Sequence, residues 1–121
     1  EVWGDGEQTR SFMYIDDCLE GTKKIFNSSL EDVYNLGSSE QVSINQMIDI
    51  IEEIADYKVN KKYLLEKPKG VRGRSSDNSK ISSDFDWAPS ISLKDGLKKT
   101  YEWINDQLKS GENTSKFTKP Y

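Results

Sequence analysis

The clearest hydrophobic pattern in the sequence lies in residues 44–57. Apolar side chains recur there at the three- and four-residue spacing of a helix: Ile44, Met47, Ile48, Ile51, Ile54 and Ala55. Ser43 and Gln46 have the spacing of a capping box, so we predict a helix that begins after Ser43 and ends near Tyr57. Acidic residues occupy the other face, and we interpret them as solvated rather than as metal ligands: Asp49, Glu52, Glu53 and Asp56.

A second helix is predicted near the start of the chain. Asp17 and Glu20 have capping-box spacing, and the helix should run to about Asn27. One face is expected to be buried, with these apolar residues on it: Leu19 and Phe26, and Cys18 and Ile25 in the adjacent row. On this pattern Cys18 is a small core residue, since no nearby cation would lower the pKa of its thiol.

Two more helices are predicted in the second half of the chain. The pair Asp77-Asn78 resembles the cap of a short helix over residues 79–85. Ser92 and Asp95 cap the last helix, in which Gly96 is the weak point. Its buried stripe is predicted to consist of Leu93, Leu97, Thr100, Tyr101, Ile104 and Leu108.

Short strands are predicted between these helices. The pair Asp5-Gly6 indicates a hairpin turn between an apolar start and a strand over residues 8–15. Further strands are expected at 33–37 and 59–65. The fold class is therefore a small α/β domain over residues 1–109, with short strands and about four helices. Residues 110–121 form a polar tail that we expect to be disordered.

Composition narrows the possible sites and compartments. The 121 residues are 34% hydrophobic, and no apolar run approaches the roughly 20 residues that cross a membrane. No signal peptide opens the chain, and a single cysteine fits a reducing compartment, so we expect a cytoplasmic protein without a membrane partner. Because there is no histidine and only one cysteine, a zinc site or a serine–histidine dyad cannot be built.

Charge is distributed unevenly along the chain. The net charge is −4, but residues 1–57 hold 13 acidic against 3 basic side chains, whereas residues 58–80 hold 8 basic against 2 acidic ones. A nucleic-acid-binding domain is usually basic overall and presents exposed aromatic residues among its charges. A basic segment in an acidic protein favours local contact with a small anion.

The basic loop, residues 70–78, concentrates this charge. Arg72 and Arg74 offer planar donor forks that suit phosphate or carboxylate, and Gly70 and Gly73 allow a backbone to approach closely. The loop therefore indicates an anion site. A solvated basic loop without a ligand is the alternative reading.

Three motifs spread across nearly the whole chain add a family resemblance. Residues 4–12 read G-D-G-E-Q-T-R-S-F and are followed by Y-I-D-D at 14–17; residues 34–38 read Y-N-L-G-S; residues 74–77 read R-S-S-D and precede F-D-W-A-P at 85–89. In this order they resemble the C-terminal part of the extended short-chain dehydrogenase/reductase family of NAD-dependent sugar-nucleotide epimerases and dehydratases. Phe85-Asp86 departs from the Leu-Gly that is usual in that family.

The resemblance implies which residues bind substrate. Arg10 and Arg74 correspond to the arginines that contact the diphosphate of a sugar nucleotide in this family. Arg72 and Ser76 are secondary candidates by proximity. Asp77 is a further candidate, expected to orient Arg74 or to cap the following helix. No catalytic, cofactor-binding or metal-binding residue is assigned in this chain.

The resemblance also implies parts that this sequence does not show. In the family a Rossmann half binds NAD and carries a tyrosine–lysine pair, and neither the glycine-rich nucleotide loop nor that pair occurs here. We therefore expect the substrate-binding portion of an epimerase or dehydratase, inactive alone, whose partners are a nucleotide-diphosphate-sugar and a Rossmann domain in a homodimeric enzyme. A different class is also open: a non-catalytic α/β module that docks an acidic or phosphorylated partner through its basic loop.

Overall fold

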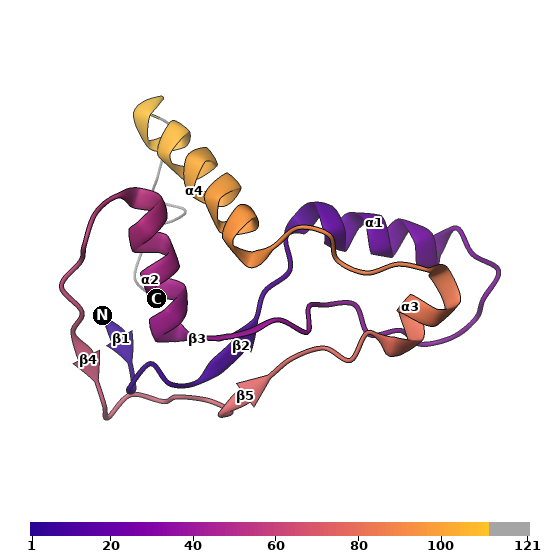
Figure 1. Ribbon diagram of the computed structural model, residues 1–121, viewed down its shortest axis with the longest axis horizontal. Helices are drawn as coiled ribbons and strands as arrows, with labels where there is room; N and C mark the ends of the chain where they lie inside the picture. Colours follow the sequence, from indigo (N-terminus) through magenta and orange to yellow (C-terminus); the bar gives the residue numbers. More distant parts are fainter. Residues whose placement is uncertain (112–121) are drawn as a thin grey trace.

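The computed structural model describes residues 1–111, so the predicted tail lies outside the described residues apart from its first two positions. Within that range the elements follow one another as β1 (Val2–Trp3), β2 (Thr9–Ser11), α1 (Ile15–Phe26), β3 (Gln41–Ser43), α2 (Ile44–Ala55), β4 (Tyr63–Leu64), β5 (Gly73–Arg74), α3 (Ser79–Phe85) and α4 (Leu93–Lys109). In Figure 1, α1 and α3 lie at one end of an elongated arrangement, and α2, β1 and β4 lie at the other.

The strands form two small sheets. β1 pairs with β4 in parallel, and a second sheet has the order β3-β2-β5, with β2 antiparallel to β3 and parallel to β5. The predicted hairpin is therefore wrong: Asp5-Gly6 makes a turn, but β1 and β2 do not pair. A turn motif specifies a local change of direction, whereas the partner of β1 comes from 61 positions later, at Tyr63.

The helices α2 and α4 begin where their caps predict. The Ser43 Oγ accepts the Gln46 N–H at 3.1 Å while the Gln46 side chain accepts the Ser43 N–H at 2.8 Å, which confirms the capping box. Ser92 likewise accepts the Asp95 N–H at 3.1 Å. The prediction is wrong for Glu52, which is only 5% exposed although it was expected on the solvated face.

The burial of Glu52 follows from the segment after α2. Its carboxylate accepts the Val59 N–H at 3.0 Å and the Lys58 ammonium at 2.7 Å, so the chain folds back over it. The Lys58 hydrogen bond and then the Val59 hydrogen bond hold the pKa of Glu52 below its usual value.

Helix α1 differs from its prediction in start and in burial. It begins at Ile15 with Tyr14 as N-cap, and Asp17 caps nothing. Instead Asp17 is 2% exposed and accepts the Ser90 hydroxyl at 3.0 Å and the Ile91 N–H at 2.9 Å. Leu19 and Phe26, predicted to be buried, are 54% and 85% exposed. Cys18 is half-buried and carries a free thiol.

Residues 33–37 form no strand, contrary to the prediction. Val33 is 84% exposed, and no strand among the described residues pairs with this segment. Tyr34 fixes it to α3, because its ring packs edge-on against Phe85 and its hydroxyl donates to Asp84 at 2.9 Å. Desolvation and the Asp84 carboxylate raise the pKa of Tyr34 to about 12. The strand predicted at 59–65 is reduced to β4.

The buried core is small and depends on close approaches at glycine. The large apolar side chains that are buried are Val2, Ile81, Trp87 and Leu93. A Cβ at Gly21 would lie 2.5 Å from Leu36 and 2.9 Å from Trp87, so α1 packs there through its backbone. Gly96 is likewise a buried contact against Tyr14 rather than a weak point. Farther along α4 the predicted stripe is wrong in part, since Tyr101 and Leu108 are exposed.

Candidate functional site

The parallel pairing of β2 with β5 brings the two predicted substrate arginines together. Arg10 stands opposite Arg74 in this register, and Thr9 stands opposite Gly73. Residues 64 positions apart in sequence thus become lateral neighbours in one small sheet, and β5 is itself part of the basic loop. The backbone of the loop is also fastened to β2 by the Thr9 N–H, which donates to the Arg72 carbonyl at 2.8 Å.

The Arg10 guanidinium organises the basic loop. Its Nη1 donates to the Thr9 carbonyl at 2.6 Å and to the Val71 carbonyl at 2.8 Å, and its Nη2 donates to the Lys69 carbonyl at 3.4 Å. Gly70 has a φ of 68° and lies against this guanidinium, where a Cβ would stand 3.2 Å from Nη2. Arg10 therefore sets the course of the loop over residues 69–71.

The Arg74 side chain is exposed and lines a pocket of about 430 Å³. Polar groups from three segments share this pocket: Ser11 at the end of β2, Asn35 and Ser38 from the segment before β3, and Ser76 after β5. No hydrogen bond or ion pair engages its guanidinium within the described part of the chain. Arg74 is thus a cation available to a ligand.

Arg72 lies in a different place from Arg74. It lines a separate pocket of about 390 Å³ with Gln8, Asp5 and Lys69 among its neighbours. Lys69 forms an ion pair with Asp5 at 2.7 Å, and this hydrogen bond holds the pKa of Asp5 below its usual value. Proximity in sequence therefore does not bring Arg72 to the Arg74 pocket.

Gln8 is a candidate that sequence reasoning missed. Its Nε2 donates to the Trp3 carbonyl at 3.1 Å, while its Oε1 is buried and has no hydrogen-bond partner among residues 1–111. A buried acceptor without a partner costs free energy unless water or a ligand satisfies it. No spacing or charge distinguishes this residue in the sequence, apart from its place within the motif at 4–12.

Ser76 and Asp77 have structural partners. The Ser76 Oγ donates to the Asn78 Oδ1 at 2.7 Å, and the Asn78 Nδ2 donates to the Gly37 carbonyl at 2.6 Å. The Asp77 carboxylate accepts the Ser79 N–H at 3.0 Å at the start of α3, and its hydrogen bonds with Ser79 hold its pKa below the usual value. No ion pair joins Asp77 to Arg74 among the described residues. Of its two expected roles, the geometry favours the cap.

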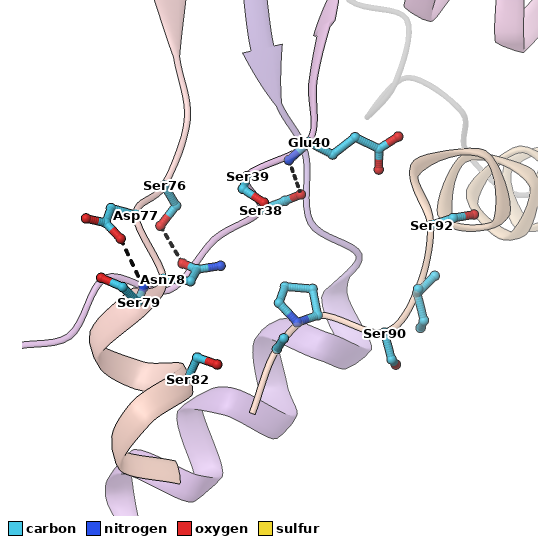
Figure 2. A pocket seen from close by; sticks show the side chains of 13 residues that line it. Ser38, Ser39, Glu40, Ser76, Asp77, Asn78, Ser79, Ser82, Ser90 and Ser92 are labelled. Atoms are coloured by element: carbon cyan, nitrogen blue, oxygen red, sulfur yellow. Dashed lines mark hydrogen bonds between the residues drawn. The ribbon is translucent and has the colours of Figure 1, made fainter. Parts of the chain in front are cut away.

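A larger pocket adjoins the Arg74 pocket, and Figure 2 shows it from close by. Its volume is about 550 Å³, and three segments line it, residues 38–40, 76–82 and 88–92. Serine is its commonest residue, at positions 38, 39, 76, 79, 82, 90 and 92. Sequence reasoning missed it because isolated serines in three loops carry no spacing signal.

The described residues contain neither a glycine-rich nucleotide turn nor a cluster of metal-ligating side chains. A dinucleotide in this fold class is held by a glycine-rich turn between a buried strand and a helix. Here Gly4 and Gly6 follow β1, but the next element is the strand β2 and not a helix. No glycine lies between β2 and α1, and β3 is followed directly by α2. Within residues 1–111 no three acidic or cysteine side chains are grouped to hold a metal ion. In the same range no helix is long and apolar enough to cross a membrane.

Comparison with known proteins gives a consistent family. A family model described as GDP-mannose 4,6 dehydratase matches residues 1–100. The chain is 46% identical over 108 residues to GDP-mannose 3,5-epimerase 1 of Oryza sativa subsp. indica, covering 89% of this chain and 28% of that protein. GDP-mannose 3,5-epimerase of Arabidopsis thaliana is 44% identical over the same shares. The chain therefore spans 28% of the length of these curated relatives.

Solved structures agree with this result. UDP-glucuronic acid 4-epimerase from Bacillus cereus, crystallised with UDP-glucuronic acid and NAD, gives a TM-score of 0.79 at 36% identity, over 87% of this chain and 34% of that one. UDP-glucose 4-epimerase from Thermotoga maritima, with UDP-glucose, gives 0.82 at 30% identity, over 89% and 36%. The α/β fold class and the family resemblance are confirmed.

Within the family, the motifs at 3–12 and 70–78 look most like those of GDP-mannose 3,5-epimerase, and the rice and Arabidopsis relatives bear this out. The family match over residues 1–100 covers most of the chain. The chain belongs to the GDP-mannose 4,6-dehydratase family, among the NAD-dependent sugar-nucleotide epimerases and dehydratases of the extended short-chain dehydrogenase/reductase class.

Proposed function

We propose that this chain is the substrate-binding portion of an NAD-dependent sugar-nucleotide epimerase most like GDP-mannose 3,5-epimerase, and that Arg74 binds the diphosphate of the substrate. One observation carries the proposal. The β2–β5 register sets Arg74 beside Arg10 in the two segments that resemble the family's motifs, and the Arg74 guanidinium has no partner within the described residues.

The chemistry of the two arginines is complementary. A guanidinium has five N–H donors, and Arg10 uses three of them in hydrogen bonds to the Thr9, Val71 and Lys69 carbonyls. Arg10 therefore holds the loop in place and retains fewer donors for a ligand, while Arg74 can offer a whole fork to phosphate oxygens. Ser76, which lines the Arg74 pocket, is a secondary contact of the same substrate, whereas Arg72 lines a separate pocket; Asp77 orders the start of α3 beside the site.

This portion would contribute binding rather than chemistry. Contacts with the nucleotide, far from the reacting carbon, hold the sugar in position against catalytic groups and NAD in a Rossmann domain that this chain does not supply. We propose that the complete enzyme is a cytoplasmic homodimer, and that these residues alone neither bind NAD nor turn over substrate. The free Cys18 is in keeping with that compartment.

Calorimetric titration with GDP and GDP-mannose tests the diphosphate site. Arg74→Ala should weaken binding by about 1.5–3 kcal/mol, the scale of a hydrogen bond to a charged group, without a change in fold. Arg74→Lys should restore only part of the loss, because an ammonium cannot reproduce the fork. Lys23→Ala, an exposed cation on α1, is the control and should bind as the parent does.

Two results would contradict this proposal. One is equal affinity of the parent and Arg74→Ala for both nucleotides. The other is binding of a phosphopeptide by a chain that ignores nucleotides, which would favour the docking module instead.

A further inference from the structure

An ion pair holds the residue at which the basic loop begins. Asp5 lies in the turn between β1 and β2, and its Oδ2 accepts a hydrogen bond from the Lys69 ammonium at 2.7 Å, 64 positions along the chain. Lys69 directly precedes the basic loop, residues 70–78. In Figure 1 the segment from β4 to β5 accordingly runs alongside the segment from β1 to β2. One carboxylate therefore joins the turn to the start of the loop that carries Arg74.

Three parts of Lys69 are held in place. Its ammonium pairs with Asp5, and its carbonyl accepts a hydrogen bond from the Arg10 Nη2 at 3.4 Å. Its methylene stem crosses Gly4, which has a φ of 81° and at which an added Cβ would lie 2.6 Å from the Lys69 Cγ. The stem is thus ordered by packing, which reduces the entropy that is lost when the ion pair forms.

Asp5 is also held by contacts other than the ion pair. Its Oδ1 accepts the Glu7 N–H at 3.1 Å, and its carbonyl accepts the Asn45 Nδ2 at 3.0 Å. The Asn45 N–H donates to the Gly6 carbonyl at 3.1 Å, so the start of α2 fixes the turn. A surface ion pair usually contributes little because two flexible side chains have to be ordered. This pair joins two side chains that other contacts already order, and it can therefore fix the loop relative to the turn.

We propose that Asp5 is a positioning residue for the diphosphate site: through Lys69 it holds the basic loop in the conformation in which Arg74 meets the substrate. This role rests on the proposed function and adds a residue that orders the site from outside it. Asp5 does not contact the ligand, because like charge would repel a diphosphate from its carboxylate. Without the ion pair the loop occupies the binding conformation for only a fraction of the time, and the apparent affinity falls by that fraction.

Charge and position predict opposite results for one substitution. Asp5→Asn can still accept the Glu7 N–H, but it loses the ion pair and removes a negative charge near an anion site. Charge alone would then tighten GDP binding, whereas loss of positioning should weaken it about three- to tenfold in calorimetry. Asp5→Glu keeps a carboxylate for Lys69 and should regain most of the affinity. Glu1→Gln, which removes a carboxylate paired with Lys62 at 3.5 Å, is the control and should bind GDP at least as tightly as the parent.

Substitution of the lysine tests the same ion pair from its other side. Lys69→Met keeps an unbranched stem over Gly4 but removes the ammonium, so it should weaken GDP binding at least as much as Asp5→Asn does. Because one interaction can be lost only once, the double variant Asp5→Asn/Lys69→Met should bind no more weakly than Lys69→Met alone. A further loss in the double variant would show that Asp5 acts independently of the ion pair and would overturn the inference.

The outcomes separate this inference from the proposed function. Circular dichroism should show the fold of the parent in every variant, so a role of Asp5 in stability alone would leave GDP affinity unchanged and overturn the inference. Tighter GDP binding by Asp5→Asn would overturn it too, and so would equal losses in Asp5→Asn and Asp5→Glu. In each of these cases the diphosphate site would stand as long as Arg74→Ala weakens binding. Failure of the parent to bind GDP would overturn the diphosphate site and, with it, the positioning role.

Discussion

Replacement of Arg10 should show how much this residue stabilises the fold. The guanidinium donates at 2.6 Å and 2.8 Å to two backbone carbonyls and more weakly, at 3.4 Å, to a third. Hydrogen bonds to a charged group contribute about 1.5–3 kcal/mol each, and partial exposure places these two at the lower end of that range. Arg10→Ala should therefore lower the free energy of unfolding by about 2–3 kcal/mol.

Urea denaturation followed by circular dichroism measures this effect. Arg10→Lys should recover less than half of the loss, because a single ammonium cannot reach the Thr9, Val71 and Lys69 carbonyls together. Arg72→Ala is the matched control, since its guanidinium has no partner within the described residues, and its stability should stay within about 0.5 kcal/mol of the parent. An unchanged unfolding midpoint in Arg10→Ala would refute the reasoning that Arg10 fastens the loop.

Two further predictions concern Asp17 and Glu52, whose burial the sequence analysis did not predict. Asp17→Ala removes the acceptors of the Ser90 hydroxyl and the Ile91 N–H, so it should lower the free energy of unfolding in urea by about 3 kcal/mol. Asp16→Ala, on the exposed face of α1, is the control and should lower it by less than about 1 kcal/mol. Equal effects of the two substitutions would show that the buried contact adds no stability. Because the pKa of Glu52 is lower in the folded chain than in the unfolded chain, its stabilisation is present above the unfolded pKa and is lost as pH falls through the folded one. Between about pH 5 and pH 3, unfolding midpoints should therefore decline more steeply in the parent than in Glu52→Gln, and parallel profiles would argue against this linkage.

The helices were largely predictable from sequence because their signals are local. Helix α3 has the predicted bounds, and α2 and α4 begin at the serine caps. Asp17 illustrates the limit of such signals. Its spacing to Glu20 satisfies the capping pattern, but Asp17 is the third residue of α1, and its carboxylate accepts hydrogen bonds from Ser90 and Ile91, more than 70 positions away.

The candidate site likewise has a part that sequence motifs predict and a part that depends on tertiary structure. Motif spacing identified Arg10 and Arg74, and the β2–β5 register makes them neighbours. The distribution of the remaining groups depends on tertiary structure: Arg72 turns to a separate pocket, and the serine-lined pocket assembles from three segments, none of which has a motif for it. Charge along the sequence indicated the proposed anion site, but it could not indicate the serine-lined pocket beside it.

Two of the errors of prediction, at α1 and at residues 33–37, share a physical cause. The spacing of Leu19 and Phe26 predicts that one face of α1 is covered, and a strand predicted at residues 33–37 requires a neighbouring strand. Neither pattern says which residues provide the cover or the neighbour. Within residues 1–111 nothing provides it: both side chains are exposed, Val33 is 84% exposed, and the segment pairs with no strand. Since the chain spans 28% of the length of its curated relatives, the part of such proteins outside this match can supply both the cover and the neighbouring strand.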